Sequence, residues 1–552
     1  MSLGKGVIRH TNIPEKLEIH LTEVEDKICN LLRECSIYLR QKKGISTTCR
    51  IAGGWVRDKL LGHQSNDMDV ALSDIMGLAF AEHLRDYAHS NGVELGPIAK
   101  IEQNPDQSKH LETARIKVFG LDLDLVNLRS EEYAKDSRIP TSVAFGQPLE
   151  DARRRDITIN ALFYNVDSRA VEDFTKKVGL DDLRHGIIRT PLPPKETFID
   201  DPLRVLRCIR FASRFGFTLV QDLKEAARDI VVQEALISKV ARERVGDELV
   251  KMIKGPAPLH SAQLIHELSL YHCIFTVVPP EAKEGLSSQF LKDNADSALR
   301  AASILNAFLS PSQFHEIVPH PALLSVVMED DSAKARLLLA ALLVPYKGMF
   351  FKDKKKDSPM VTAVIRDSLK LGTQNHFLDG VPTLFSALPL VKEHLQQSSS
   401  RPLTRVELGL FLRDKLVHNA NTGTHWTTSL LFALITDLEP LYNLPEDSLA
   451  INAATEIVSS YNSFLTLILD LGLQNDVDSK PLLNGREVRT ALGLLKDGPW
   501  IGKVMEDVVK WQLAHPTGSK DDCLEWLKEQ GPDLQIGKDE DRQVPSKRIR
   551  TR

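Results

Sequence analysis

The most informative pattern in the chain is IAGGWVRDKLLGHQSNDMDVAL, residues 51–72. Two glycines open it and an Asp-x-Asp, Asp67 and Asp69, closes it. Successive side chains of a strand point to opposite faces, so these two carboxylates project from the same face. The apolar residues that flank Asp69 point the other way, into a core. Two like charges held this close are costly unless a cation neutralises them. The stretch therefore predicts a glycine turn followed by a strand that carries a paired-carboxylate cation site.

The chemistry of these residue types indicates a metal and a phosphate. Paired Asp side chains on a rigid strand suit Mg²⁺, which prefers carboxylate and phosphate oxygens. Gly53 and Gly54 let the backbone approach a phosphate closely. Taken alone, Asp-x-Asp also fits a solvated edge strand after a turn. The combination of GG-x-V-R-D with D-x-D favours a functional site.

A third carboxylate is expected if two metal ions drive an in-line phosphoryl displacement. The stretch LDLDLVNLR, 121–129, places Asp122 and Asp124 on one face of a second predicted strand. We choose Asp124 because the apolar pair Leu-Val follows it directly. A solvent-facing alternation is the other interpretation of this strand.

Composition limits the class of protein. The 552 residues suit several domains, and 42% hydrophobic with 26% charged residues is typical of a soluble globular chain. No apolar run approaches the ~20 residues of a membrane-spanning helix. The net charge of −5 argues against general nucleic-acid binding, and a chain of this charge that does bind nucleic acid must do so through local basic patches. The six cysteines are scattered, which indicates reduced, buried thiols in an intracellular protein.

The spacing of apolar residues, and with it the predicted secondary structure, changes along the chain. Residues 14–43 are predicted to form an amphipathic helix, with a capping box of Thr22 and Glu25. Residues 48–190 mix strand and helix periods, and from Pro202 onward the period is helical almost throughout. We predict five parts: an N-terminal helix and head (1–190), a neck (191–260), a helical body (261–400), a helical tail (401–535) and a flexible basic C-terminus (536–552).

Five motifs, in order, carry a resemblance to a known family. They are GG-x-V-R-D with D-x-D (motif A), RRDITINALFYN from 154 (motif B), EDFTKKVGLDDLRHGIIRT from 172 (motif C), DDPLRVLRCIRFASRFGF from 200 (motif D) and ARERVGDEL from 241 (motif E). The chain resembles the nucleotidyltransferase superfamily that includes DNA polymerase β. More narrowly, it is similar to the class II tRNA nucleotidyltransferases, the CCA-adding enzymes, of eukaryotic and fungal type. One departure is Asp200, where bacterial members usually carry Glu; the carboxylate is kept.

The resemblance implies an α/β, polymerase β-like nucleotidyltransferase head followed by an all-α neck, body and tail. It also implies template-independent addition of C, C and A to the 3′ end of tRNA from CTP and ATP, with two Mg²⁺ ions and release of pyrophosphate. The protein itself must then select the base. Asp201, a natural N-cap before Pro202, offers an acceptor beside the donor Arg204. Such a pair matches the amine and bare ring nitrogen of C and A, and it rejects U and G. Otherwise these residues are a cap and a surface arginine.

The resemblance assigns the remaining site residues. Motif B lies near ribose and triphosphate, and an Asp and an Asn there can contact the 2′-OH. Arg207 continues a basic stripe with Arg210 and Arg214, which meets phosphate or pairs with acids such as Glu248. Motif E is expected to brace the motif D helix. The predicted catalytic residues are Asp67, Asp69 and Asp124, of which Asp67 and Asp69 hold metal. The predicted nucleotide-binding residues are Gly53, Gly54, Arg57, Arg155, Asp156, Asn160, Asp201, Arg204 and Arg207.

The expected partner is tRNA, held by its acceptor and TψC arms. A Gly-Pro turn at Gly498 opens a helix whose N–H groups could hold a tRNA phosphate, although a plain packed turn is equally compatible. We expect a monomer, no membrane association, and a cytoplasmic location with nuclear and mitochondrial forms left open. Alternatives are a poly(A) polymerase, an enzyme that adds only A, and a non-catalytic tRNA-binding protein, which the intact Asp67 and Asp69 oppose. An enzyme that adds only CC is disfavoured, because the segment before motif B is full length.

Overall fold

The structure is a computed structural model that describes residues 11–101, 113–133, 140–276, 279, 282, 288–310, 317–353, 356–494 and 498–530. The chain divides into two compact units. Unit 1 comprises Met1–Phe314, Lys334–Val381 and Tyr442–Leu449, and unit 2 comprises His315–Ala333, Pro382–Leu441 and Ala450–Arg552. The borders of the five predicted parts at 190, 260, 400 and 535 stay predictions, and the basic segment 536–552 lies outside the described residues.

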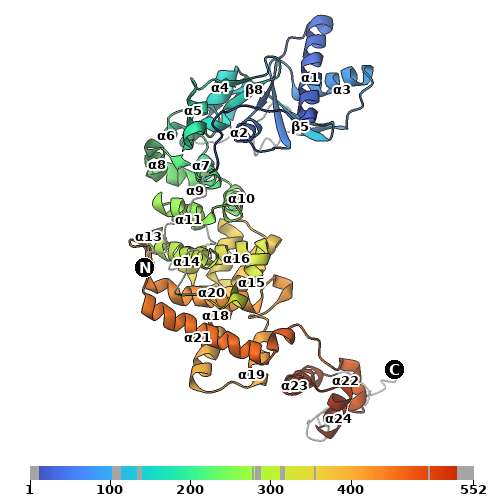
Figure 1. Cartoon of the computed structure of the whole chain (residues 1–552), viewed down its shortest axis with the longest axis vertical. Helices are drawn as coiled ribbons and strands as arrows, with labels where there is room; N and C mark the ends of the chain where they lie inside the picture. The colour runs from blue at the N-terminus through green and yellow to red at the C-terminus, as the bar shows by residue number, and fades with distance from the viewer. Residues whose placement is uncertain are drawn as a thin grey trace, which may run out of the picture. The chain divides into compact units, whose positions relative to one another are not determined.

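A seven-stranded mixed sheet forms the centre of the head in unit 1 (Figure 1). The strand order is β3-β4-β5-β2-β1-β8-β9, and only β2 and β5 run parallel to each other. The strands are β1 (Cys49–Ala52), β2 (Asp67–Leu72), β3 (Ile98–Ile101), β4 (Thr113–Val118), β5 (Leu121–Asn127), β8 (Leu162–Asn165) and β9 (Ala170–Asp173). A separate hairpin joins β6 (Arg129–Tyr133) to β7 (Pro140–Phe145).

The buried positions of β2 and β5 follow the predicted period of two. Met68 and Val70 of β2 are fully buried, as are Leu123 and Leu125 of β5. Around this core lie α2 (Gly54–Leu60), α3 (Gly77–Ser90), α4 (Pro148–Arg153) and α5 (Val178–His185). The predicted mixed α/β head is therefore confirmed.

The N-terminal helix is shorter than the predicted range of 14–43. Helix α1 spans Glu23–Tyr38 and continues as a π-helix to Lys43. The expected capping box is present: Thr22 N donates to Glu25 Oε2 at 2.6 Å, and Glu25 N donates to Thr22 Oγ1 at 3.2 Å. The helix starts at residue 23 because this cap satisfies its first amides, so the residues before it are not helical.

Helices follow the head, as predicted from residue 202 onward. They include α6 (Pro194–Asp200), α7 (Leu203–Phe215), α8 (Gln221–Arg228), α9 (Ile230–Lys239), α10 (Arg242–Ile253), α11 (Pro258–Glu267) and α14 (Ala295–Phe308). Helix α10 packs closely against the segment after Val364, since a Cβ on Gly246 would lie 1.9 Å from the carbonyl oxygen of Leu369. Buried Arg242 donates to the carbonyl oxygen of Ser368 at 2.7 Å. Helix α10 is therefore fixed by residues more than a hundred positions away.

Unit 2 is helical. Its principal helices are α15 (Pro321–Glu329), α18 (Phe377–Ser400, which begins in unit 1), α19 (Arg405–Arg413), α20 (Trp426–Leu438), α21 (Ile451–Asp470), α22 (Gly485–Ala491), α23 (Trp500–Ala514) and α24 (Lys520–Gln530). Gly409 of α19 lies so near α23 that a Cβ would meet Leu513 Cδ2 at 2.5 Å. A cluster around Val504, Val508 and Trp511 forms the core of the last three helices.

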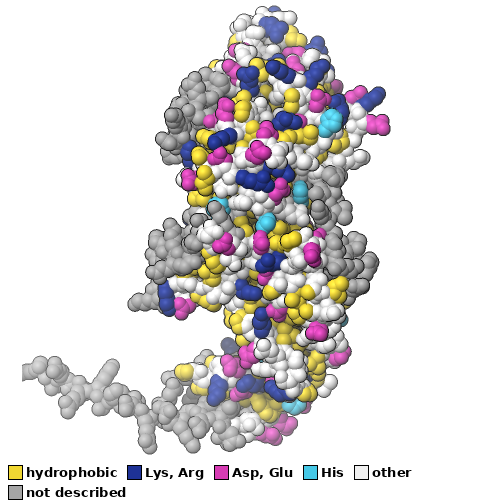
Figure 2. Space-filling view, turned by 90° about the vertical axis from the view of Figure 1, so that its left-hand side faces the viewer, with side chains coloured by type: hydrophobic (Ala, Val, Ile, Leu, Met, Phe, Trp, Pro, Cys, Tyr) yellow, Lys and Arg dark blue, Asp and Glu magenta, His cyan; other side chains and the backbone are white. Residues whose placement is uncertain are grey.

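The cysteines, the helix lengths and the surface charge agree with the composition of the chain. All six cysteines, which lie in the described ranges, are buried and outside any disulfide, as predicted. Each helix in the described ranges is too short or too polar to cross a lipid bilayer. Figure 2 shows Lys and Arg side chains scattered among Asp and Glu on the face it draws, as the small net charge leads one to expect.

Candidate active site

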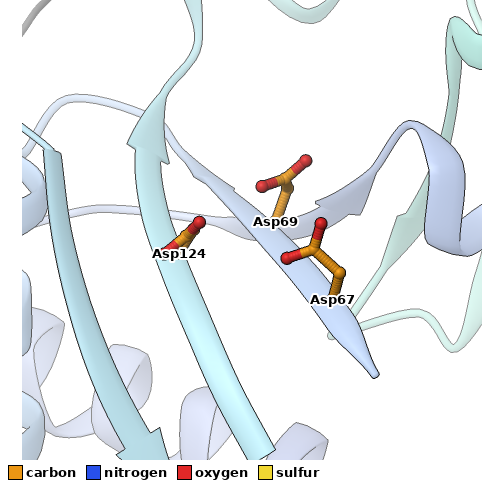
Figure 3. Close-up of side chains that lie close together, drawn as sticks. All are labelled: Asp67, Asp69 and Asp124. Carbon is orange, nitrogen blue, oxygen red and sulfur yellow. The ribbon is translucent and has the colours of Figure 1, made fainter. Parts of the chain in front are cut away.

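Three carboxylates meet at the centre of the sheet. Asp67 and Asp69 project from β2, and Asp124 projects toward the same space from β5 (Figure 3). One oxygen of each lies within 4.8 Å of the others. The parallel register pairs Asp69 with Asp124 and Asp67 with Asp122. Asp122 instead points to solvent, with 54% of its side chain exposed. The structure therefore brings together the trio that the sequence suggested.

The trio fits a hard divalent cation. Its donors are all carboxylate oxygens, the ligands that Mg²⁺ prefers. Burial, followed by the negative charges of Asp67 and Asp124, raises the pKa of Asp69 to about 6. This raised pKa indicates negative charge that the protein alone does not neutralise, which a bound cation would relieve.

The predicted glycine turn lies beside these acids. Gly53 has φ 73° and precedes α2, and a Cβ there would lie 2.9 Å from Arg155 Nη1. Arg155 is held by Asp151, whose Oδ2 accepts from its Nε at 3.0 Å and from its Nη2 at 2.8 Å. Burial alone would raise the pKa of Asp151, but the charges of Arg155 and Arg154 lower it. The positive charge of Arg155 also acts on Asp69. Gly53 thus gives this guanidinium room near the acid trio.

Motif B forms a buried polar network with motif A. Asn160 Nδ2 donates to Asp156 Oδ1 at 3.0 Å, while its Oδ1 accepts from Arg57 Nη1. Arg57 is 3% exposed, and its guanidinium lies 4.9 Å from the ring centroid of Phe215. Arg57 therefore connects α2 with α7. Contact between nucleotide and Arg57, Asp156 or Asn160 stays a prediction.

Helix α7 presents its arginines to acids. Arg207 Nε and Nη2 both lie 2.7 Å from Asp156 Oδ2. Burial alone would raise the pKa of Asp156, but Arg207 and Asn160 hold it at about 2. Arg210 Nε lies 2.5 Å from Glu248 Oε2, and Arg214 lies 3.5 Å from Asp58. These contacts fit the alternative in which the basic stripe pairs with acids.

Asp201 and Arg204 are both engaged, but with other groups. Arg204 Nη2 donates to the carbonyl oxygen of Arg154 at 2.6 Å. Asp201 Oδ2 lies 3.2 Å from Arg244 Nη2, and its Oδ1 accepts from Leu203 N at 3.3 Å. Helix α7 begins at Leu203, one residue later than expected, and its N-cap is Pro202 rather than the predicted Asp201, which instead is the C-cap of α6. The backbone N–H of Arg204 donates to the carbonyl oxygen of Asp201 at 3.0 Å, but within the described ranges no hydrogen bond joins their side chains. Their shared role in base selection stays a prediction.

Sequence reasoning missed two residues that shape the site, and it gave a third only a general bracing role. Arg115 of β4 binds Asp124, Asp151 holds Arg155, and Arg244 pairs with Asp201. The alternating TARIKV could have placed Arg115 on the polar face of a strand. No local signal indicated which strand lies beside it. The predicted helix after the Gly-Pro turn is present as α23, which begins at Trp500.

Comparisons with known proteins agree with this geometry. Residues 49–189 match the family described as poly A polymerase head domain, and 216–286 match the probable RNA and SrmB-binding site of polymerase A. The mitochondrial CCA tRNA nucleotidyltransferase of Saccharomyces cerevisiae is 38% identical over 93% of this chain and 94% of its own. The tRNA nucleotidyltransferase cca2 of Schizosaccharomyces pombe is 34% identical over 92% of this chain and 98% of its own.

A solved structure shows the same fold. The Thermotoga maritima CCA-adding enzyme, complexed with tRNA, aligns with a TM-score of 0.55 over 91% of this chain and 95% of that chain. Its identity of 20% supports the fold alone. The two fungal relatives cover nearly their full lengths at more than 30% identity. This chain therefore belongs to the family of CCA tRNA nucleotidyltransferases.

Proposed function

We propose that this protein adds C, C and A to the 3′ end of tRNA without a nucleic-acid template, using CTP and ATP and releasing pyrophosphate. The observation that carries the proposal is the convergence of Asp67, Asp69 and Asp124 beside the Gly53 turn. Carboxylates beside a phosphate-binding turn are what nucleotidyl transfer requires. The names of the fungal relatives support tRNA as the acceptor.

Asp67 and Asp69 would hold two Mg²⁺ ions, with Asp124 completing the site. When bound, the ions would activate the 3′-OH of tRNA and stabilise the leaving pyrophosphate. Arg155 lies beside Gly53, and Asp151 holds its guanidinium in place through a hydrogen bond. A guanidinium fixed in this position suits a contact with the triphosphate. The chain thus supplies both the charge of the site and the donors that orient the substrate.

Base selection falls to Asp201 and Arg204 in this proposal. Two of the five N–H groups of Arg204 are used by backbone carbonyls, at Arg154 and Thr197, so others remain for a base. Asp201 keeps acceptor capacity beyond its bonds to Arg244 and Leu203. Each side chain is therefore anchored and still able to bind, as a protein template requires.

The helical remainder would measure the acceptor and TψC arms of tRNA. Lys503 of α23 is exposed next to the predicted phosphate-binding turn at Gly498. Replacing Lys503 with Glu should weaken tRNA binding and reduce its salt dependence, because one phosphate contact is lost. Unchanged affinity and salt slope would remove this helix from the interface. A truncation near Gly255 is a poorer test, since Arg242 bonds residues beyond that point.

The decisive experiment offers purified protein three tRNAs, which lack CCA, end in C or end in CC, each with CTP or ATP alone. We expect CMP on the first two and AMP on the third. Poly(A) polymerase activity, which the description of the matched head domain also favours, predicts long AMP runs and no CMP. An enzyme that adds only A would use the third tRNA alone. No incorporation on any tRNA would contradict the proposal.

Oligomeric state and location belong to the same proposal. We propose a monomer, which light scattering of the purified protein would test. We also propose cytoplasmic activity with nuclear and mitochondrial forms; the Saccharomyces cerevisiae relative bears "mitochondrial" in its name. Cell fractionation followed by the addition assay on each fraction would test the location.

A further inference from the structure

Arg115 clamps one of the three carboxylates. It stands directly opposite Asp124 in the antiparallel register of β4 and β5. Its Nε donates to Asp124 Oδ1 and its Nη2 to Asp124 Oδ2, each at 2.6 Å. Bidentate arginine–carboxylate pairs of this kind are among the strongest hydrogen-bonded contacts between side chains. Each carboxylate oxygen of Asp124 therefore uses one lone pair to accept a hydrogen bond from Arg115.

The clamp changes the charge of the site. Three ionised carboxylates and one guanidinium leave a net charge of two minus, which a single divalent ion balances. Asp151 pairs with both Arg155 and Arg154, so these three side chains together carry one positive charge and add no negative charge to the site. A second divalent ion would therefore have to enter a site whose negative charge is already balanced. A nucleotide triphosphate would bring its own negative charge with it.

We propose that Arg115 competes with divalent metal for Asp124 and limits the nucleotide-free site to one ion, so that the second ion arrives with the triphosphate. This inference rests on the metal assignment in the proposed function. Two physical effects act in the same direction. The positive charge of Arg115 repels a cation at the trio, and its N–H groups occupy oxygen lone pairs that a metal would use.

Lys117 offers a matched control on the same strand. It lies two residues after Arg115, on the same face of β4, with 57% of its side chain exposed against 50% for Arg115. Its partner is the exposed Asp122, 3.9 Å away, which is not part of the trio. Removing either cation changes the charge of the protein equally, but only Arg115 contacts a site carboxylate.

The experiment measures Mn²⁺ binding to the full chain without nucleotide, by electron paramagnetic resonance of free Mn²⁺. We expect one bound ion in the wild type. Arg115→Ala should bind the first ion about three- to tenfold more tightly, the effect of one unit charge a few ångströms from a divalent ion at an exposed site. Arg115→Lys keeps the charge, and it should stay within about twofold of wild type, as should Lys117→Ala.

Weaker or unchanged binding by Arg115→Ala would overturn the inference, as would two tight ions in the nucleotide-free wild type. An Asp69→Asn variant separates this result from failure of the proposed function. If Asp69→Asn binds Mn²⁺ as the wild type does, the metal assignment itself is wrong. If Asp69→Asn loses the ion while Arg115→Ala does not tighten it, only the role of Arg115 is refuted.

Discussion

Arg207 of α7 and Asp156 of motif B form an ion pair in which two guanidinium nitrogens lie 2.7 Å from one carboxylate oxygen. The other oxygen of Asp156 accepts from Asn160, which also accepts from Arg57. These contacts connect α2, the motif B turn and the helix that carries Arg204. The predicted base-selecting helix is therefore tied to the glycine turn beside the acid trio.

Removal of Arg207 should lower the free energy of unfolding. Arg207→Ala leaves Asp156, 7% exposed, without its main partner, and we expect a loss of about 1–3 kcal/mol in the free energy of unfolding. Arg214→Ala on the same helix is the control. Its pair with Asp58 is longer, at 3.5 Å, and 45% of the Arg214 side chain is exposed, so we expect a loss of about 0–1 kcal/mol. Urea unfolding of both variants checks this, and equal losses would contradict it.

The low pKa of Asp156 gives stability a defined pH dependence. The pKa of Asp156 is about 2 in the folded state and near 3.8 in the unfolded state. Its ionised carboxylate therefore stabilises the fold above pH about 4. That contribution is lost as pH falls from about 4 to 2. Asp156→Asn should remove this part of the acid sensitivity. Unfolding free energies at pH 3 and pH 6 test it; a difference between the two pH values as large in the variant as in wild type would argue against the pair.

Asp69 should show the opposite sign. Its pKa is raised from 3.8 to about 6, so its ionised form destabilises the metal-free fold above pH about 6. Below pH about 4 it is protonated in both states and costs nothing. In EDTA at pH 7.5, Asp69→Asn should therefore be more stable than wild type by about 2–3 kcal/mol. The gain should vanish at pH 4 and shrink when Mg²⁺ binds the wild type. Urea unfolding under these three conditions decides, and a less stable variant at pH 7.5 would refute it.

Asp201 and Arg204 should govern the choice of base. Asp201→Ala should impair CMP and AMP addition together, because one carboxylate serves both bases. Arg204→Ala should lower discrimination against UTP and also the rate, since a site group left unpaired costs about 1–3 kcal/mol. The measurement is kcat/KM for four nucleotides on tRNA ending in C and in CC. Wild-type preferences in both variants would place base selection elsewhere.

Arg244 should act through Asp201. Arg244→Ala frees one oxygen of that carboxylate, so we expect KM for CTP and ATP to rise together, about three- to tenfold, with kcat less affected. The control is Arg228→Ala, which removes an arginine of similar exposure that pairs with Glu267. Steady-state kinetics of both variants test this, and equal effects would show that Arg244 has no special connection to the nucleotide.

Gly53 should tolerate no side chain. Gly53→Ala combines φ 73° with a Cβ 2.9 Å from Arg155 Nη1, so the guanidinium must move. Gly62→Ala is a matched control, because Gly62 has φ 78° and open space around it. Both should lose about 1–2 kcal/mol of stability through strain. Only Gly53→Ala should lose tenfold or more in kcat/KM. If both variants keep activity, the position of Arg155 does not matter for the reaction.

The sequence alone determined the local features of this protein. The Asp-x-Asp strand, the capping box of Thr22 and Glu25, and the glycine turn were all predicted, because periodicity and capping depend on neighbours a few residues apart. Motif order identified the family, and Asp124 was selected over Asp122 from the apolar residues that follow it. The observed first residues of two helices, Glu23 and Leu203, differ from the predicted ones, because a cap or a proline shifts the first turn.

Only the tertiary structure decided which groups meet. The register of β2 on β5 puts Asp124 beside Asp69, and the register of β4 on β5 puts Arg115 on Asp124. The side chain of Asp201 pairs with that of Arg244, not with that of Arg204, because α7 and α10 pack together. Strand register and helix packing are set by the whole buried core, and a shift of one residue would turn each of these side chains to the other face. No short stretch of sequence holds that information, so the partners of the predicted site residues had to come from the fold.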